Sequence, residues 1–291
     1  MSVRILVLGG KGFIGRHAIA ALRTRGLEPV IGTRSPAPAS NEQLFRLENK
    51  TSASTWREVT AQFDVILNCV GILRPQGAAT YERVHHQAPA AIASACEGTT
   101  TRFIQVSALG LSHSDRSGFL RTKLIGEQAI AQTRSDWIIV RPSLLDGEGG
   151  YGAAWLRGVA RLPVFITPTD AQGAIAALTA TDLGEALAQL CTAEPAKLRL
   201  EHSRIFELGG ERTYTFAQYI RGLRRNYSAR KALAIPIPGL LARAGAHLCD
   251  LLRFSPFSFG HWELLRKDNK PDPNRLPELL GRAPSIVIEE V

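Results

Sequence analysis

Arg4-Ile-Leu-Val-Leu-Gly-Gly-Lys-Gly-Phe-Ile-Gly15 is the stretch that decides the fold of this chain. Its first five residues predict a strand, glycines follow at positions 9, 12 and 15, and a helical pattern comes next. Glycines at this spacing allow a tight turn, a close approach of backbone N–H groups to a diphosphate, and close packing of helix on strand. The alternative is a plain strand-to-helix turn. We favour a dinucleotide-binding loop whose cofactor contacts are Gly9, Lys11, Gly12, Phe13, Ile14 and Gly15.

Length and composition are those of a globular protein. The chain has 291 residues, of which 45% are hydrophobic, and its net charge is +9. This length accommodates one α/β domain and a smaller lobe. The first strand begins almost at Met1, and no stretch reaches the ~18 apolar residues of a membrane span. We therefore expect a cytoplasmic protein without a signal peptide.

The residue types that bind metals are scattered. The four cysteines lie at positions 69, 96, 191 and 249, without metal-ligand or redox-pair spacing. His85 and His86 are adjacent, and adjacent side chains on a helix do not share a face. We expect reduced thiols and no metal site.

Strand and helix patterns alternate through the first two thirds of the chain. Strands are predicted at 4–8, 28–32, 65–69, 102–106, 137–140 and 205–208. Helices are predicted at 15–25, 54–61, 89–96, 121–133 and 182–191, the last capped by Thr181. This alternation predicts a Rossmann-type α/β fold with a doubly wound parallel sheet, whose ligand lies at the carboxyl ends of the strands.

The regular alternation stops near Gly209, and prolines become frequent. We therefore expect a dinucleotide-binding domain over 1–211 and a small, mainly helical lobe over 212–291. The segment 143–174 is expected to be an excursion from the domain that reaches the lobe.

The second predicted strand ends in Thr33 and Arg34, near the point where NAD-binding sites usually carry an acidic residue for the ribose. A guanidinium instead suits the 2′-phosphate of NADP, and Lys11 adds positive charge in the glycine loop. NADP(H) is the preferred cofactor, and NAD(H) remains an alternative. Arg34 could also be a solvated loop residue.

Several segments resemble atypical extended short-chain dehydrogenases/reductases. They are Asn68-Cys-Val-Gly-Ile-Leu73, Arg102-Phe-Ile-Gln-Val-Ser-Ala-Leu-Gly110, Arg121-Thr-Lys-Leu-Ile-Gly-Glu127, Ile139-Val-Arg-Pro-Ser143 and Glu263-Leu-Leu-Arg-Lys-Asp-Asn269. Within that family the chain is most similar to the nucleotide-binding accessory subunit of respiratory complex I and its bacterial relatives. The resemblance implies contacts to the adenine-ribose side for Val70, Gly71 and Ile72, to the nicotinamide for Ser107, to its ribose for Lys123, and to the carboxamide for Pro142 and Ser143.

One position departs from the family pattern. Active reductases of this family carry a tyrosine, the general acid or base, four residues before the lysine, but this chain has Phe119 before Lys123. A positioned acid contributes about 10²–10⁴-fold in rate, so we expect ordinary carbonyl reduction to be impaired. Candidates to replace the tyrosine are Ser107, Ser112, His113 and Asp115, and His113 is expected in an exposed loop.

The lobe is strongly basic. No Asp or Glu occurs from Arg212 to Cys249, and leucines crowd the end of the stretch 212–254. Such a segment can contact an anionic membrane or a membrane complex through Arg221, Arg224 and Arg225. Alternatively, it packs its apolar face on the main domain. No nucleic-acid partner is expected, because its aromatics lack the spacing of a stacking platform.

Two classes of function follow. The favoured one is an NADP(H)-binding structural or regulatory protein in a respiratory or membrane-associated setting, cytoplasmic and peripheral to the inner face of a membrane. The alternative is an NADPH-dependent oxidoreductase or isomerase acting on an apolar substrate such as a quinone or isoprenoid. Whether the chain is an enzyme stays open at this point.

Overall fold

The computed structural model describes residues 3–34, 41–228, 230–253 and 255–289. A central sheet of seven strands has the order β10-β6-β5-β4-β1-β2-β3, and every neighbouring pair is parallel. The strands are β1 (Ile5–Leu8), β2 (Val30–Thr33), β3 (Glu42–Leu44), β4 (Val65–Asn68), β5 (Arg102–Val106), β6 (Asp136–Pro142) and β10 (Ile205–Leu208). The predicted Rossmann-type fold is confirmed.

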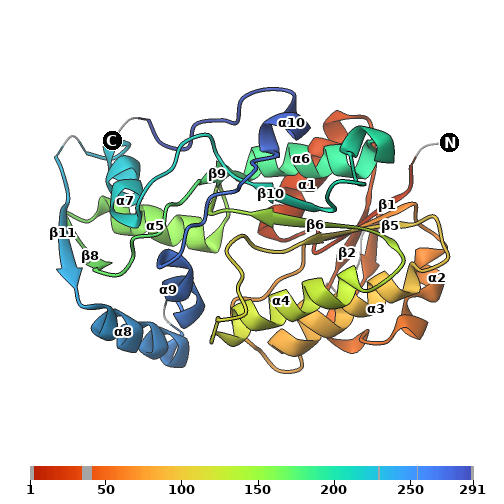
Figure 1. Cartoon of the computed structure of the whole chain (residues 1–291), viewed down its shortest axis with the longest axis horizontal. Helices are drawn as coiled ribbons and strands as arrows, with labels where there is room; N and C mark the ends of the chain where they lie inside the picture. The colour runs from red at the N-terminus through yellow and green to blue at the C-terminus, as the bar shows by residue number, and fades with distance from the viewer. Residues whose placement is uncertain (1–2, 35–40, 229, 254, 290–291) are drawn as a thin grey trace.

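Helices cover both faces of this sheet (Figure 1). One face carries α1 (Phe13–Thr24) and α6 (Ala180–Thr192), and the other carries α3 (Ala88–Ala95) and α4 (Gly118–Ala131). Every residue of β1, β4 and β5 is buried, which explains their nearly continuous apolar sequences. The ends of the strands therefore lie open to a ligand between the two helical layers.

Local details differ from the sequence-based expectations at two helices. Over 54–61 the chain forms a 3-10 turn, Ala53–Thr55, and a single helical turn, α2 (Arg57–Thr60). The predicted cap of α6 is wrong, because Thr179 caps that helix by accepting a hydrogen bond from the Asp182 N–H at 3.0 Å. Thr181 lies inside the first turn, where its hydroxyl cannot take the capping position.

The lobe is assembled from separate stretches of chain. Its elements are α5 (Tyr151–Arg161), β8 (Val164–Pro168), α7 (Phe216–Arg225), β11 (Leu233–Ile237), α8 (Gly239–Leu252) and α9 (Phe259–Leu265). β8 and β11 pair in parallel, with Leu233 opposite Val164, and α5 and α7 share one apolar core. The segment 143–174 thus supplies a helix and a strand beside the lobe elements. The boundary at 211/212 itself stays a prediction.

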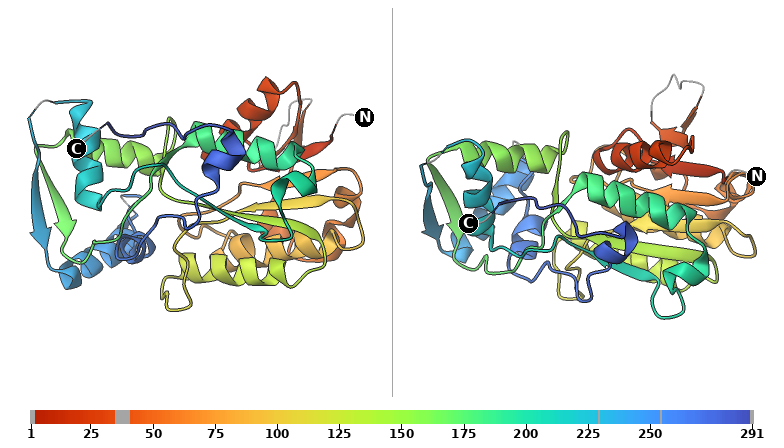
Figure 2. Two further views of the ribbon diagram at one scale, coloured as in Figure 1. Left: turned by 45° about the horizontal axis from the view of Figure 1, so that its top comes forward. Right: turned by 90° about the horizontal axis from the view of Figure 1, so that it is seen from above.

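Two further connections run between the domain and the lobe. The short strands β7 (Leu145–Asp146) and β9 (Leu178–Thr179) pair at the exits of the excursion. α10 (Leu276–Leu280) lies on α6, so the chain returns to the dinucleotide-binding domain after forming the lobe (Figure 2).

One of the arginines that make the lobe basic lies inside the protein. Arg224 is buried, and its guanidinium donates to the carbonyl oxygens of Arg230 at 2.7 Å, Leu162 at 2.8 Å, Arg161 at 3.0 Å and Ala160 at 3.2 Å. A buried charge is tolerated only with such partners. The expectation that Arg224 contacts a membrane is therefore wrong, whereas Arg221 and Arg225 are exposed.

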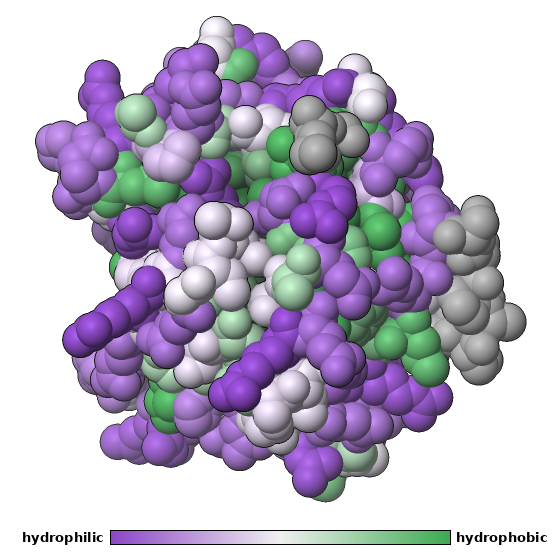
Figure 3. Space-filling view, turned by 90° about the vertical axis from the view of Figure 1, so that its right-hand side faces the viewer, coloured by the Kyte–Doolittle hydropathy of each residue, from purple (hydrophilic) through white to green (hydrophobic). Residues whose placement is uncertain are grey.

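Polar side chains dominate the end of the molecule remote from the lobe. In the space-filling view of that face, hydrophilic residues surround small apolar areas (Figure 3). Within the described ranges, no helix is both long and apolar enough to cross a membrane.

Candidate functional site

The glycine loop between β1 and α1 has the geometry of a phosphate cradle. Gly9 has φ +72° and its N–H donates to the Gly32 carbonyl at 3.0 Å. A Cβ on Gly15 would lie 2.3 Å from the Gly9 carbonyl oxygen, so a side chain there would force the loop away from the helix. Gly12 occupies the N-cap position of α1, where no described side chain caps the helix. The first N–H groups of α1 are therefore available to an anion.

Phe13 and Ile14, two predicted cofactor contacts of this loop, also pack against other parts of the protein. The Phe13 ring lies against the backbone at Gly147 and Gly150, and a Cβ on Gly150 would approach it to 2.8 Å. Ile14 is partly buried and packs on the sheet core. Phe13 thus joins the loop to the segment after β7.

Arg34, directly after β2, is the side chain predicted to bind the 2′-phosphate on the adenosine ribose. Thr33 is buried, whereas Arg34 is exposed and forms no ion pair with another described residue. Lys11 Nζ lies 2.7 Å from Glu42 Oε2, so a carboxylate already balances its charge. Arg34 is therefore the one of the two predicted cations without a carboxylate partner among the described residues, and both cofactor contacts stay predictions.

Polar side chains hold the segment that follows β4. The Val70 N–H donates to Asn68 Oδ1 at 3.1 Å, and the Ile72 N–H donates to His85 Nε2 at 3.1 Å. Burial and then the Lys123 charge hold the pKa of His85 well below its usual range, which keeps the imidazole neutral and able to accept. Gly71 lies exposed between these anchors. Sequence reasoning considered His85 only as a metal ligand and missed this positioning role.

The carboxyl ends of β5 and β6 differ in what their serines contact. The Ser107 side chain is buried, and its Oγ has no hydrogen-bond partner within the described chain. Ser143 Oγ lies 2.7 Å from Asn269 Oδ1, and Pro142 ends β6 opposite Leu208. Ser143 is therefore engaged by the lobe, while Ser107 retains an unused hydroxyl.

Lys123 and Phe119 lie on the same side of α4. Lys123 Nζ is 5.6 Å from the Phe119 ring centroid and forms no hydrogen bond or ion pair with any residue that the structure describes. Burial lowers the pKa of Lys123 to about 8, opposed by the charge of Glu127. The other neighbours of the Phe119 ring are aromatic, with centroids at 5.4 Å for His85, 6.0 Å for Tyr81 and 6.1 Å for His261.

The other candidates to replace the tyrosine have hydrogen-bond or ion-pair partners of their own. Asp115 is buried, ion-paired with Lys267, and accepts from the Ser112 N–H at 2.8 Å. His113 is exposed, as expected, with Nε2 3.3 Å from the Gln128 amide. Among the considered side chains, Ser107 and Lys123 are the ones without a hydrogen bond or ion pair to another described residue.

The segment 263–269 fastens the lobe to the loop after β5. The two Glu263 oxygens accept from the Arg116 N–H at 2.9 Å and the Ser117 N–H at 2.8 Å. Asn269 Nδ2 donates to the Leu109 carbonyl at 2.8 Å. The loop that leads into α4, and with it Phe119 and Lys123, is thereby positioned by the lobe.

The glycine loop follows β1 and Ser107 follows β5, so both lie at the carboxyl edge of the parallel sheet, where folds of this kind bind dinucleotides. Residues 9–158 match the profile of the NAD(P)H-binding family, and the chain belongs to this family.

Two curated relatives differ in the extent of their similarity. The ceramide reductase of Caulobacter vibrioides is 26% identical over 285 residues, covering 94% of this chain and 88% of the relative. Subunit 9 of the NADH dehydrogenase [ubiquinone] 1 alpha subcomplex of Rattus norvegicus is 30% identical over 151 residues, or 48% of this chain and 40% of the relative. Similarity to the reductase thus extends through the lobe.

Solved structures share the fold at low identity. A nucleoside-diphosphate-sugar epimerase of Staphylococcus aureus superposes with a TM-score of 0.72 at 14% identity, covering 97% of both chains. An NADPH-dependent quinone oxidoreductase of Escherichia coli, solved with NADPH, superposes with a TM-score of 0.71 at 16% identity, covering 97% of this chain and 96% of that one.

Proposed function

We propose that this protein is an NADP(H)-dependent reductase of a lipid-like carbonyl compound, with Lys123 as the proton donor. The observation that carries the proposal is the Lys123 ammonium beside Phe119, which lacks a hydrogen-bond partner among the described residues and has a pKa lowered to about 8 by burial. A lysine with this pKa can release a proton near neutral pH, which an ordinary lysine does poorly.

The residues divide the work as follows. Gly9, Gly12 and Gly15 hold the diphosphate, and Arg34 binds a 2′-phosphate. A reduced nicotinamide cofactor supplies the hydride when bound. Lys123 donates a proton to the carbonyl oxygen, which leaves an alcohol, and the neutral amine regains its proton from water. The unpaired Ser107 hydroxyl donates a hydrogen bond to the same oxygen.

A lipid-like substrate is supported by two features. One relative, matched over 94% of this chain, is a ceramide reductase. In addition, α8 exposes several leucines beside the domain, in the region 212–254 that was expected to face a membrane. We therefore place the protein at the surface of a membrane, where it would meet amphiphilic substrates.

A second candidate function is favoured by Phe119. Its ring cannot transfer a proton, and it lies against the rings of Tyr81, His85 and His261. A cofactor-binding structural component requires no proton donor, and the chain is also similar over 151 residues to a subunit of NADH dehydrogenase [ubiquinone].

Turnover distinguishes these functions. NADPH oxidation would be measured with long-chain ketones, 3-keto sphingoid lipids and quinones in mixed micelles, for the native protein, Lys123→Met and Phe119→Tyr. The proposal expects slow ketone reduction by the native protein, at least about 10²-fold loss in Lys123→Met, and a gain in Phe119→Tyr. Tight NADPH binding without turnover of any substrate by the native protein would instead support the structural role.

A further inference from the structure

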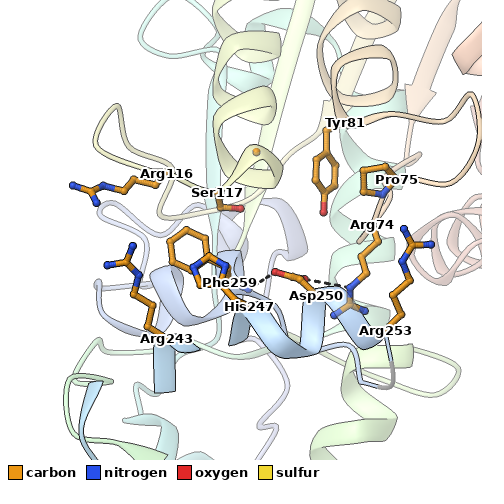
Figure 4. Close-up of a pocket in the computed structure, with 11 residues that line it drawn as sticks. Arg74, Pro75, Tyr81, Arg116, Ser117, Arg243, His247, Asp250, Arg253 and Phe259 are labelled. Atoms are coloured by element: carbon orange, nitrogen blue, oxygen red, sulfur yellow. Dashed lines mark hydrogen bonds and ion pairs between the residues drawn. The ribbon is translucent and has the colours of Figure 1, made fainter. Parts of the chain in front are cut away.

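A cavity of about 470 Å³ lies between the lobe and the dinucleotide-binding domain. Its volume is that of a typical small-ligand site. Its polar lining includes Arg74, Arg116, Arg243, His247, Asp250 and Arg253 (Figure 4). None of its lining residues belongs to the glycine loop, and Tyr81 and Gly118 place it next to Phe119.

The single carboxylate of this cavity is already neutralised. Asp250 Oδ1 lies 3.2 Å from Arg74 Nε, and Asp250 Oδ2 accepts from the Phe259 N–H at 2.9 Å. The remaining Arg74 nitrogens donate to the carbonyl oxygens of Ser255 at 2.7 Å and Phe257 at 2.8 Å. Arg74 and Asp250 therefore form a closed pair that builds the wall of the cavity.

Three other arginines of the cavity have no carboxylate among the described residues to balance their charge. Arg116, Arg243 and Arg253 form no ion pair with any residue in the described part of the chain. Arg243 and Arg116 lie on one side of the cavity and Arg253 on the other (Figure 4). Arg243 is held by the Phe259 ring, 5.7 Å from its centroid. Like charges gathered around one cavity repel one another, and a bound anion would relieve that repulsion.

The helix that carries Arg243 also has an uncovered apolar face. Ala242 and Ala246 are buried against α9, whereas five leucines project outward. Their exposed fractions are 76% for Leu240, 60% for Leu241, 51% for Leu248, 76% for Leu251 and 58% for Leu252. Their spacing places them on one side of α8, next to the side that bears Arg243, His247 and Asp250. An apolar face beside a cationic site suits a ligand with an anionic head and apolar chains.

We infer that this cavity binds the phosphate headgroup of an anionic phospholipid, while the leucine face of α8 enters the outer part of the acyl layer. This extends the membrane location in the proposed function, and its test requires no turnover. Basic groups near an anionic surface and buried apolar side chains contribute independently to such binding. The face remote from the lobe is mainly hydrophilic, consistent with one-sided attachment (Figure 3).

Vesicle flotation of the full chain tests this inference. The vesicles would be pure phosphatidylcholine or phosphatidylcholine with phosphatidylglycerol, each at low and high salt. We expect binding to the anionic vesicles, loss of at least about tenfold in affinity in Arg116→Gln/Arg243→Gln, and a similar loss in Leu240→Asn/Leu251→Asn. Arg221→Gln is the matched control, because Arg221 is an exposed arginine of the lobe that the sequence suggested as a membrane contact but that lies outside the cavity.

Three results would overturn the inference. The native chain could fail to float with anionic vesicles, Arg221→Gln could weaken binding as much as the cavity variants, or saturating glycerol phosphate could occupy the cavity without displacing the protein from anionic vesicles. NADPH affinity would be measured for every variant. Unchanged NADPH affinity shows that the variants fold, and it separates failure of the lipid site from failure of the proposed reductase activity.

Discussion

The Ser143 hydroxyl lies 2.5 Å from the carbonyl oxygen and 2.7 Å from the side-chain oxygen of Asn269, so its single proton is donated to one of them. Asn269 also donates to the Leu109 carbonyl at 2.8 Å. One side chain of the lobe thus connects the segments that follow β5 and β6, on either side of the predicted nicotinamide site. The lobe is therefore part of the cofactor-binding architecture.

Asn269→Ala should lower the free energy of unfolding by about 1–3 kcal/mol, because it leaves the buried Leu109 carbonyl without its donor and removes one of the two acceptors of the Ser143 hydroxyl. Urea unfolding would measure the change. Lys270→Ala, at an exposed neighbouring position, should stay within about 0.5 kcal/mol of the native protein. Equal effects of the two substitutions would contradict the connecting role of Asn269.

The rate of reduction should fall as the pH rises through about 8. Lys123 must be protonated to donate, and its pKa is lowered to about 8 by burial. The rate should therefore be nearly constant below this value and fall about tenfold per pH unit above it. Steady-state rates with saturating NADPH from pH 6 to 10 would check this. A rate that is constant to pH 10 would mean that another group supplies the proton.

Lys123→Met should stabilise the protein without cofactor. Because the folded state lowers the pKa of this lysine, the unfolded chain binds the proton more strongly, and stability from this group rises with pH between about 8 and the usual lysine value of about 10.4. Removing the charge removes that cost at neutral pH. Thermal unfolding at pH 7 should show a higher midpoint in Lys123→Met, whereas the stabilisation by added NADPH should be smaller than in the native protein. A lower midpoint without cofactor would show that the ammonium stabilises the fold.

NADPH should bind more tightly than NADH, and Arg34→Asp should remove most of the difference. Losing a charged hydrogen bond to a 2′-phosphate costs roughly 10- to 100-fold in affinity. Dissociation constants of both cofactors would be measured by fluorescence. Lys11→Ala is the informative comparison and should have the smaller effect, because Lys11 is already paired with Glu42. Equal affinities of the native protein for the two cofactors would contradict the assignment of Arg34.

The sequence was sufficient for the fold because its signals are local. Each signal is read from a few consecutive residues: the glycine loop, the individual strand and helix patterns, and the family segments. The architecture predicted from them is confirmed. The partners of Ser143, Arg224 and His85 could not be predicted, because they come from distant parts of the chain and leave no periodic pattern. The assigned roles of the individual site residues stay predictions.

The pairing of β8 with β11 limits which segments can be exchanged between related proteins by recombination. Strands that lie side by side in the lobe are contributed by stretches on either side of α6 and β10. A single genetic crossover near residue 211 would join a β8 and a β11 that had never been selected together, in contrast to a tandem arrangement of independent modules. New substrate preferences should therefore arise mainly by substitutions within the existing lobe, and chimaeras between relatives should keep 143–174 with the segment that bears β11.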